Sequence, residues 1–319
     1  MLCNSVKDLS KINKEEKKLI EEWKKTDFEE VNIESFLMPQ RKIDIICNKI
    51  SLLKGMLLVG STSIGKSFMV LNRVKKNKVD FEYYKTHFAP TELFKELYSI
   101  QKTYEQKQNT ENPFFLVIFD DMNVMNDEKI INILKGALRE NNGKRIVEMH
   151  TIERILQETP KRFNFTGHII IIANKINLKS ENVLAIKDRT HYEELDFSYK
   201  EMLKIMSNII KTDFPNTTFD LRKKALELIK ETTDITTNEL NFSTLIRAFD
   251  YLNYNPKQAK ELLISTLNID EEKKFVYELM KSNEDIETQV IKYKLETAKS
   301  RSSFYRIKQQ INKELKQKI

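Results

Sequence analysis

The chain has 319 residues, enough for two or three domains, and its hydrophobic content of 40% is ordinary for a globular protein. The net charge of +7 is compatible with a polyanionic partner, and two cysteines far apart without neighbouring metal ligands exclude a disulfide framework. Because the N-terminus lacks a signal-peptide pattern and no aliphatic run approaches the roughly 18 residues of a membrane-spanning helix, we expect a cytoplasmic protein with no membrane partner.

Residues 1–38 are mostly charged and helix-favouring and Pro39 interrupts them, so we expect an N-terminal helical segment over 1–38. From about Lys54 to Phe197, short apolar runs alternate with amphipathic stretches. The runs are Gly55–Val59, Val79–Tyr84, Phe114–Phe119, Ile169–Ala173 and Tyr192–Phe197. Continuous apolar strands separated by helices indicate a parallel sheet covered on both faces, so residues 39–198 are predicted to form an α/β domain.

A phosphate-binding loop is predicted directly after the first strand. The pattern G-x-x-x-x-G-K-[ST] is matched by Gly60, Ser61, Thr62, Ser63, Ile64, Gly65, Lys66 and Ser67, followed by an amphipathic helix. In this context the glycines let the backbone wrap the phosphates of ATP, and the helix N-terminus adds partial positive charge. Lys66 is expected to reach the β- and γ-phosphates, and Ser67 to ligate Mg²⁺.

Two further apolar strands end in polar residues: one is followed by Asp120 and Asp121, the other by Asn174. After a P-loop, Asp120 is expected to hold the Mg²⁺ shell, and Asp121 to orient and deprotonate the attacking water. Asn174 is expected to bond that water or the γ-phosphate. Paired acids also begin many loops and asparagine is a common turn residue, so the interpretation depends on the order of the three motifs.

The P-loop, the paired acids and the strand that ends in Asn174 follow one another in this order, and helices come after them. This arrangement resembles the AAA+ ATPase family over roughly residues 40–252, where the three motifs are called Walker A, Walker B and sensor 1. The segment Pro160–Gly167 is similar to phage and viral AAA+ ATPases, and frequent Lys, Asn and Ile are typical of an AT-rich genome. The resemblance implies ATP hydrolysis at the interfaces of a homo-oligomeric ring or spiral, in the host cytoplasm if the source is a phage or virus.

Two other family features match less closely. Ala185–Arg189 resembles the segment that carries the arginine finger, which stabilises charge on a neighbour's ATP, so Arg189 is the candidate finger and Arg162 the alternative. Residues 199–268 show helical periodicity and are predicted to form a lid. Within it, Leu240–Arg247 resembles the sensor 2 helix, but Ser243 stands where many members have Arg, which leaves Arg247 as the nucleotide-contacting candidate.

Residues 269–319 are predicted to form a helix-turn-helix domain. Nine basic and three acidic residues lie within 286–319, so +6 of the net charge of +7 is found there. Ile286–Glu296 is predicted to be one helix, and Ser300 the N-cap of a second, Arg301–Gln310, which resembles a DNA-recognition helix. Its outward residues, expected to contact DNA, are Arg301, Ser302, Ser303, Tyr305, Arg306 and Gln309. Two helices of an ordinary bundle would give a similar pattern.

A second candidate contact with DNA lies between Gly143 and Phe165. Its basic residues are Lys144, Arg145, Arg154, Lys161 and Arg162. In viral helicases that this region resembles, an insertion before the sensor strand forms a DNA-contacting hairpin. A solvated loop would carry the same charges.

We therefore predict an ATP- and Mg²⁺-dependent AAA+ ATPase that acts on DNA in replication, recombination or packaging, with proteins of those processes as further partners. Two alternatives stay open. One is an ATP-gated DNA-binding switch, such as a replication initiator or transcription regulator, with little turnover; the other is a helicase or clamp loader. Asp121, where the family more often has Glu, and Ser243, where it often has Arg, keep the switch open as an alternative.

Overall fold

The computed structural model describes residues 34–85, 87–121, 127–150, 159–211, 214, 217–238 and 240–316. The chain divides between Asp196 and Phe197 into two compact parts, which we call the α/β unit (Glu34–Asp196) and the helical unit (Phe197–Ile319). No helix in the described ranges is both long and apolar enough to cross a membrane.

The α/β unit contains, in chain order, α2 (Glu34–Ile46), β1 (Gly55–Gly60), α3 (Lys66–Lys76), β2 (Phe81–Tyr84), α4 (Pro90–Lys107), β3 (Leu116–Asp120), α5 (Glu128–Leu138), β4 (Ile146–Glu148), β5 (Arg162–Asn164), β6 (His168–Ala173), α7 (Glu181–Lys187) and β7 (His191–Leu195). Five of the strands form one sheet in the order β2-β3-β6-β1-β7, with every neighbouring pair parallel. All five apolar runs predicted from the sequence are strands of this sheet.

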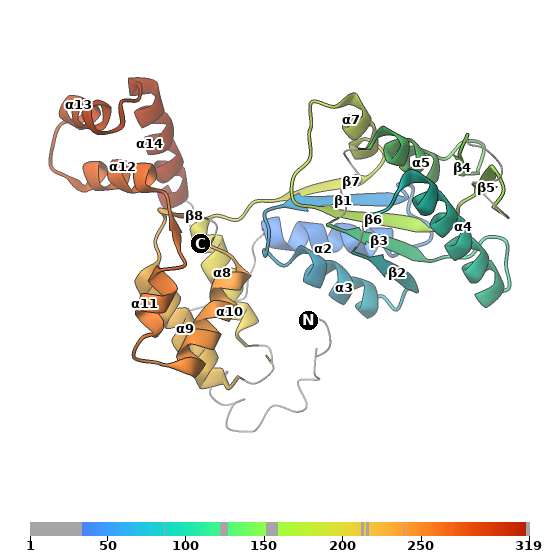
Figure 1. Ribbon diagram of the computed structural model, residues 1–319, viewed down its shortest axis with the longest axis horizontal. Helices are drawn as coiled ribbons and strands as arrows, with labels where there is room; N and C mark the ends of the chain where they lie inside the picture. The colour runs from blue at the N-terminus through green and yellow to red at the C-terminus, as the bar shows by residue number, and fades with distance from the viewer. Residues whose placement is uncertain are drawn as a thin grey trace. The chain divides into compact units, whose positions relative to one another are not determined.

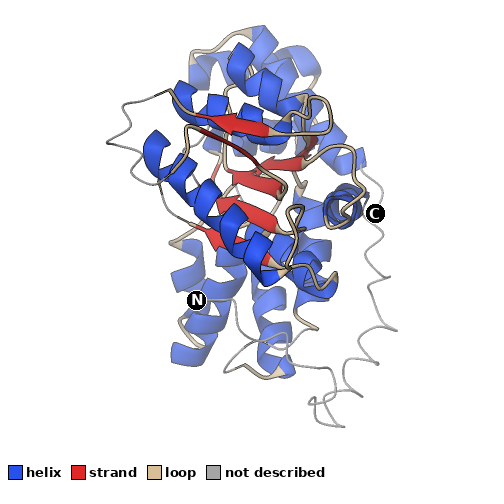
Figure 2. Cartoon of the chain, turned by 90° about the vertical axis from the view of Figure 1, so that its right-hand side faces the viewer, coloured by secondary structure: helices blue, strands red, loops and turns tan. Residues whose placement is uncertain are grey.

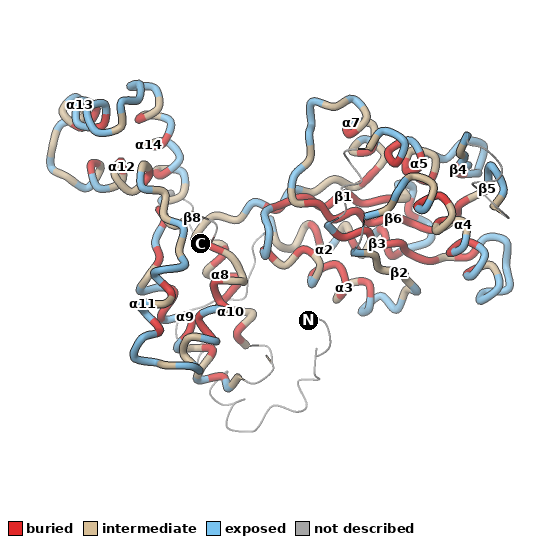
Figure 3. Tube along the Cα trace, viewed as in Figure 1, coloured by how far each residue is buried: buried red, intermediate tan, exposed pale blue. Residues whose placement is uncertain are grey.

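Helices cover both faces of the sheet, as Figures 1 and 2 show. Side chains alternate along a strand, so Leu57 and Val59 of β1 pack on one face with residues of α4, α5 and α7. Met56 and Leu58 point to the opposite face, where α2 and α3 lie side by side. The central strands β1, β3 and β6 are accordingly buried along their whole length, whereas the edge strands β2 and β7 are mostly half-buried (Figure 3). Burial on both faces explains why the central strands appear in the sequence as continuous apolar runs.

Pro39 lies inside α2, so the prediction that it ends a helical segment is wrong. Proline has no amide hydrogen, so one hydrogen bond of the helix is lost at this position. Its ring is buried. Residues 1–33, which make up most of the predicted N-terminal segment, lie outside the described residues.

The helical unit contains α8 (Tyr199–Ile209), α9 (Phe219–Thr232), β8 (Thr237–Asn238), α10 (Phe242–Tyr254), α11 (Ala259–Ile264), β9 (Asn268–Ile269), α12 (Glu271–Lys281), α13 (Ile286–Thr297) and α14 (Arg301–Lys316). Most of the longer helices begin after a side chain that accepts hydrogen bonds from first-turn amides. These caps are Ser198, Thr218, Asn241, Asp270 and Asp285. The two-residue strands β8 and β9, which the sequence did not suggest, pair antiparallel.

Candidate nucleotide-binding site

The strand order brings the three predicted motifs to one edge of the sheet. Strand β6 lies between β3 and β1 and is parallel to both. The register places Asp120 opposite Ile172, and Val59 opposite Ala173. The loop after β1, the acids at the end of β3 and Asn174 after β6 therefore meet at the carboxyl ends of adjacent strands, the usual ligand-binding edge of a parallel sheet.

The loop between β1 and α3 has the backbone that its sequence requires. Gly65 is in the left-handed region with φ 87°, directly before α3 begins at Lys66. A Cβ atom on Gly60 would lie 2.6 Å from the Leu195 carbonyl oxygen, so only glycine fits there. Ser61, Thr62 and Ser63 are exposed, whereas Ile64 is buried and anchors the loop.

Lys66 is held in the middle of the site. Its Nζ donates to the carbonyl oxygens of Gly60 and Ser61, each at 2.7 Å, and to Oδ1 of Asn174 at 3.0 Å. The side chain is buried, and this burial lowers the pKa of Lys66, while Asp120 and Asp121 act in the opposite direction.

Asn174 also donates from Nδ2 to Oδ1 of Asp121, so a hydrogen-bonded chain Lys66–Asn174–Asp121 joins the three motifs. Asp121 is exposed and has φ 56°, a left-handed conformation that is strained for a non-glycine residue. Its amide donates to the Ile172 carbonyl oxygen at 3.1 Å, which fixes this turn against β6. Backbone strain of this kind often occurs at functional sites.

Asp120 is almost fully buried at the end of β3, and the hydroxyl of Tyr83 in the neighbouring strand β2 donates to its Oδ2. Tyr83 was not among the site residues predicted from the sequence. The signal was available, because Tyr83 stands near the carboxyl end of a predicted strand, where polar atoms face the site.

The site residues fit ATP with Mg²⁺. The glycine-containing loop and the first turn of α3 present backbone amides and a lysine, which suit phosphate oxygens. The carboxylate of Asp120 and the half-buried hydroxyl of Ser67 offer oxygen atoms, the ligand type that Mg²⁺ prefers. Ser67 and Asp120 are the side chains that would hold the metal.

Arg189 lies at the opposite end of the sheet. It precedes β7, and the register pairs His191 with Met56 and Leu195 with Gly60. Five residues of strand, on the order of 17 Å, therefore separate Arg189 from the P-loop of its own chain. Its Nη1 donates to the Ala185 carbonyl oxygen in the last turn of α7. The alternative, Arg162, is exposed on β5.

The predicted lid residue Arg247 is exposed on α10 of the helical unit. Its contact with nucleotide stays a prediction.

The last three helices, α12 to α14, pack around one small core that includes Val276, Tyr293, Phe304, Ile307 and Ile311. Helix α14 therefore buries Phe304, Ile307 and Ile311 on one face. Of the predicted DNA-contacting residues, Arg301, Ser302, Arg306 and Gln309 are exposed, and Ser303 and Tyr305 are half-buried. The Ser303 amide donates to Oγ of Ser300, so the predicted N-cap is present. Helix α14 runs six residues beyond the predicted end.

The basic segment Gly143–Phe165 contains the antiparallel pair β4 and β5, with Val147 opposite Phe163. Arg145 is not available to DNA as predicted. Its side chain is 5% exposed, and Nη1 donates to the carbonyl oxygens of Ala137 and Gly167. A count of charges in the sequence could not show that Arg145 is buried, because the burial comes from its side chain turning inward beside the β4–β5 pair. Lys144, Lys161 and Arg162 are exposed, and Arg154 lies outside the described residues.

The predicted fold class is confirmed: a parallel α/β core with a P-loop is followed by a helical unit. No family profile matches the sequence, and no curated protein matches it at a significant level. The similar solved structures include the following three. A DNA replication initiation factor has 13% identity and a TM-score of 0.39, over 87% of this chain and 84% of its own. The replication initiator DnaA bound to AMPPCP and single-stranded DNA has 11% identity and a TM-score of 0.40, and the similarity covers 76% of this chain and 67% of the DnaA chain. Domain III of the Thermotoga maritima replication initiation protein DnaA has 13% identity and a TM-score of 0.41, and the similarity covers 74% of this chain and 93% of the domain III chain.

Proposed function

We propose that the protein is an AAA+ ATPase that binds ATP with Mg²⁺ at the carboxyl edge of its sheet, hydrolyses it, and acts on DNA. The observation that carries this proposal is the hydrogen-bonded chain Lys66–Asn174–Asp121, which joins the P-loop, the strand β6 and the paired acids in one site. Three motifs from distant parts of the sequence would not converge in this way by chance.

In the proposed reaction, water attacks the γ-phosphorus, the bond to the ADP oxygen breaks, and the carboxylate of Asp121 accepts a proton from the water. Asn174 orients Asp121 through their hydrogen bond, and Lys66 binds the phosphate oxygens. Bound Mg²⁺ supplies positive charge that offsets the charge of the phosphates.

The proposal also covers how the subunits assemble and in which process on DNA the protein acts. Because Arg189 is remote from the P-loop of its own chain, it suits a finger that acts on a neighbouring subunit of a ring or spiral. The basic C-terminal helices suit a DNA contact. The function is then ATP-driven work on DNA in replication, recombination or packaging, of phage or viral type, in the cytoplasm.

The test separates binding from turnover. Lys66→Ala should lose ATP affinity, because only backbone dipoles and Mg²⁺ then meet the phosphate charge. Asp121→Asn should still bind ATP but release no phosphate. Both are measured by equilibrium nucleotide binding and by phosphate release with and without DNA. Phosphate release by Asp121→Asn at the wild-type rate would show that Asp121 is not the base.

A specific observation favours the ATP-gated switch as a second candidate. Asp121 is one methylene shorter than the Glu of most relatives in the family it resembles, and its Oδ1 is already bonded to Asn174. In a switch, the wild-type protein would release almost no phosphate even with DNA, while ATP would still increase its DNA affinity. The same two assays therefore distinguish the candidates.

A further inference from the structure

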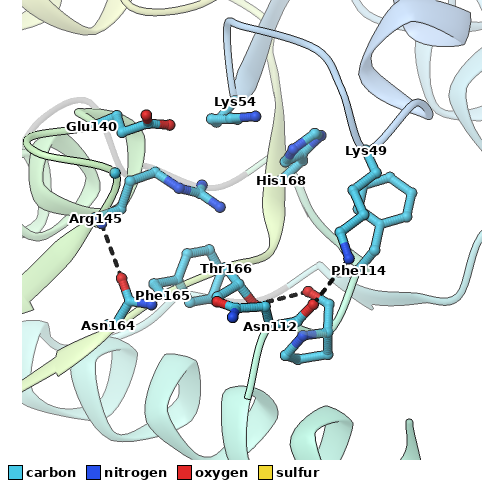
Figure 4. A pocket seen from close by; sticks show the side chains of 12 residues that line it. Lys49, Lys54, Asn112, Phe114, Glu140, Arg145, Asn164, Phe165, Thr166 and His168 are labelled. Atoms are coloured by element: carbon cyan, nitrogen blue, oxygen red, sulfur yellow. Dashed lines mark hydrogen bonds between the residues drawn. The ribbon is translucent and has the colours of Figure 1, made fainter. Parts of the chain in front are cut away.

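A cavity lies at the end of the sheet opposite the P-loop. Its volume is about 250 Å³, and its lining includes Lys54, directly before β1, and His168, the first residue of β6. The rim is exposed at Lys49 and Glu140, whereas Arg145 and His168 on the floor are almost completely buried. Figure 4 shows these side chains around the cavity.

The lining carries excess positive charge. Lys49, Lys54 and Arg145 are cationic, and Glu140 is the acidic residue among the lining side chains. A buried guanidinium normally has a carboxylate partner, because an unpaired charge away from water is costly. Arg145 is in no ion pair of the described part of the chain. Desolvation lowers its pKa to about 10, and Glu140 offsets this only in part.

Arg145 keeps donors for a ligand. Its Nη1 is used by the Ala137 and Gly167 carbonyl oxygens, at 2.9 and 2.6 Å, which leaves the donors on Nε and Nη2. In Figure 4 the guanidinium reaches toward Lys54 and His168. Burial lowers the pKa of Lys54 and that of His168, and the nearby positive charge of Arg145 lowers both further.

We propose that this cavity binds a small phosphate-bearing anion, with Arg145 and Lys54 contacting its oxygens. Two cations that face one cavity, one of them buried with free donors, match the several oxygens and the charge of a phosphate. The half-buried ring of Phe114 forms a wall beside His168, at 5.0 Å between ring centres, and accommodates an apolar part of the ligand. The site is separate from the proposed ATPase site and does not rest on it.

The test uses the full chain carrying Lys66→Ala, so that the P-loop does not compete, and inorganic pyrophosphate as the probe in titration calorimetry. Lys54→Gln should weaken pyrophosphate binding about tenfold, the loss of one charge-assisted hydrogen bond. Glu140→Gln should strengthen it, because the acid in the lining is removed. Lys129→Gln, which neutralises an exposed lysine on α5, is the matched control and should change nothing.

Opposite effects of Lys54→Gln and Glu140→Gln support the site, since general damage to the fold would move both in the same direction. Absence of pyrophosphate binding at millimolar concentrations overturns the proposal, as does binding that neither variant alters. A short single-stranded oligonucleotide is titrated in parallel. If the two variants alter oligonucleotide binding but not pyrophosphate binding, the cavity is a nucleic-acid contact and the small-anion proposal is wrong.

Discussion

The hydroxyl of Tyr83 in β2 donates a hydrogen bond to the carboxylate of Asp120 at the end of β3. The two strands are neighbours, with Tyr83 opposite Ile118 in the register, so the tyrosine reaches across one strand spacing to the acid. The bond occupies one carboxylate oxygen and leaves the other for a metal shell. Tyr83 is therefore a positioning residue for the proposed Mg²⁺ site.

We expect Tyr83→Phe to raise the Mg²⁺ concentration needed for half-maximal ATP hydrolysis about tenfold, because a hydrogen bond to a charged group is lost. Phosphate release at varied Mg²⁺ measures this. Tyr84→Phe is the matched control, since it removes a hydroxyl that bonds Glu96 instead. Equal Mg²⁺ dependence in Tyr83→Phe and the wild type would contradict the positioning role.

Arg189→Ala should leave ATP binding nearly unchanged and abolish hydrolysis, because the arginine is too far from its own P-loop to bind that nucleotide. Mixing this variant with Asp121→Asn should restore part of the activity, since mixed assemblies contain some interfaces with both residues intact. Arg162→Ala is the comparison. If no mixing ratio restores phosphate release, Arg189 is not a finger acting between subunits.

The exposed face of α14 is tested by point variants, because deleting α13 and α14 would expose Val276 and Leu279 of α12. We expect Arg306→Ala to weaken DNA binding by about 1–3 kcal/mol if it contacts bases, and to flatten any sequence preference. Lys257→Ala, which removes an exposed charge after α10, is the control. Binding isotherms at several salt concentrations measure both; equal losses would indicate only a general charge effect.

Ala298 ends α13 in the left-handed region, with φ 54° and ψ 19°. This conformation costs a non-glycine residue about 1–2 kcal/mol. Glycine avoids that cost but loses more conformational entropy on folding, so only part of the roughly 1–2 kcal/mol is regained. Ala298→Gly should therefore raise the free energy of unfolding of the helical unit by about 0.5–1 kcal/mol. Ala298→Val should lower it. Scanning calorimetry on both variants decides the sign.

His168 predicts acid sensitivity of the α/β unit. It is 2% exposed, its Nδ1 bonds the Ile46 carbonyl oxygen, and desolvation lowers its pKa from 6.5 to about 4. The unfolded chain therefore binds a proton more readily, so stability is retained above pH 6.5 and falls as the pH approaches 4. Between pH 7.5 and 5 the loss should be about 2 kcal/mol. Urea denaturation should show a smaller loss in His168→Gln and an unchanged loss in His150→Gln, at an exposed histidine.

The sequence predicted the sheet and the P-loop well because their signals are local: a buried strand is a continuous apolar run, and the loop needs its glycines and lysine in fixed order. Contacts between side chains of different strands are harder to predict from the sequence. Tyr83 and Asp120 are 37 residues apart, and only the strand order makes them neighbours. Arg145 was misread for a related reason, since its carbonyl partners Ala137 and Gly167 come from two other elements.

The contacts of Lys66 also bear on how phosphate would bind. An ammonium group has three hydrogens, and three acceptors, two loop carbonyls and the Asn174 amide oxygen, already take them. Each hydrogen bond from Lys66 to a phosphate must therefore replace an existing one, so entry of nucleotide is an exchange of partners. The affinity for ATP is a difference between two sets of contacts, and releasing Asn174 from Lys66 would free its oxygen at the moment the phosphate arrives.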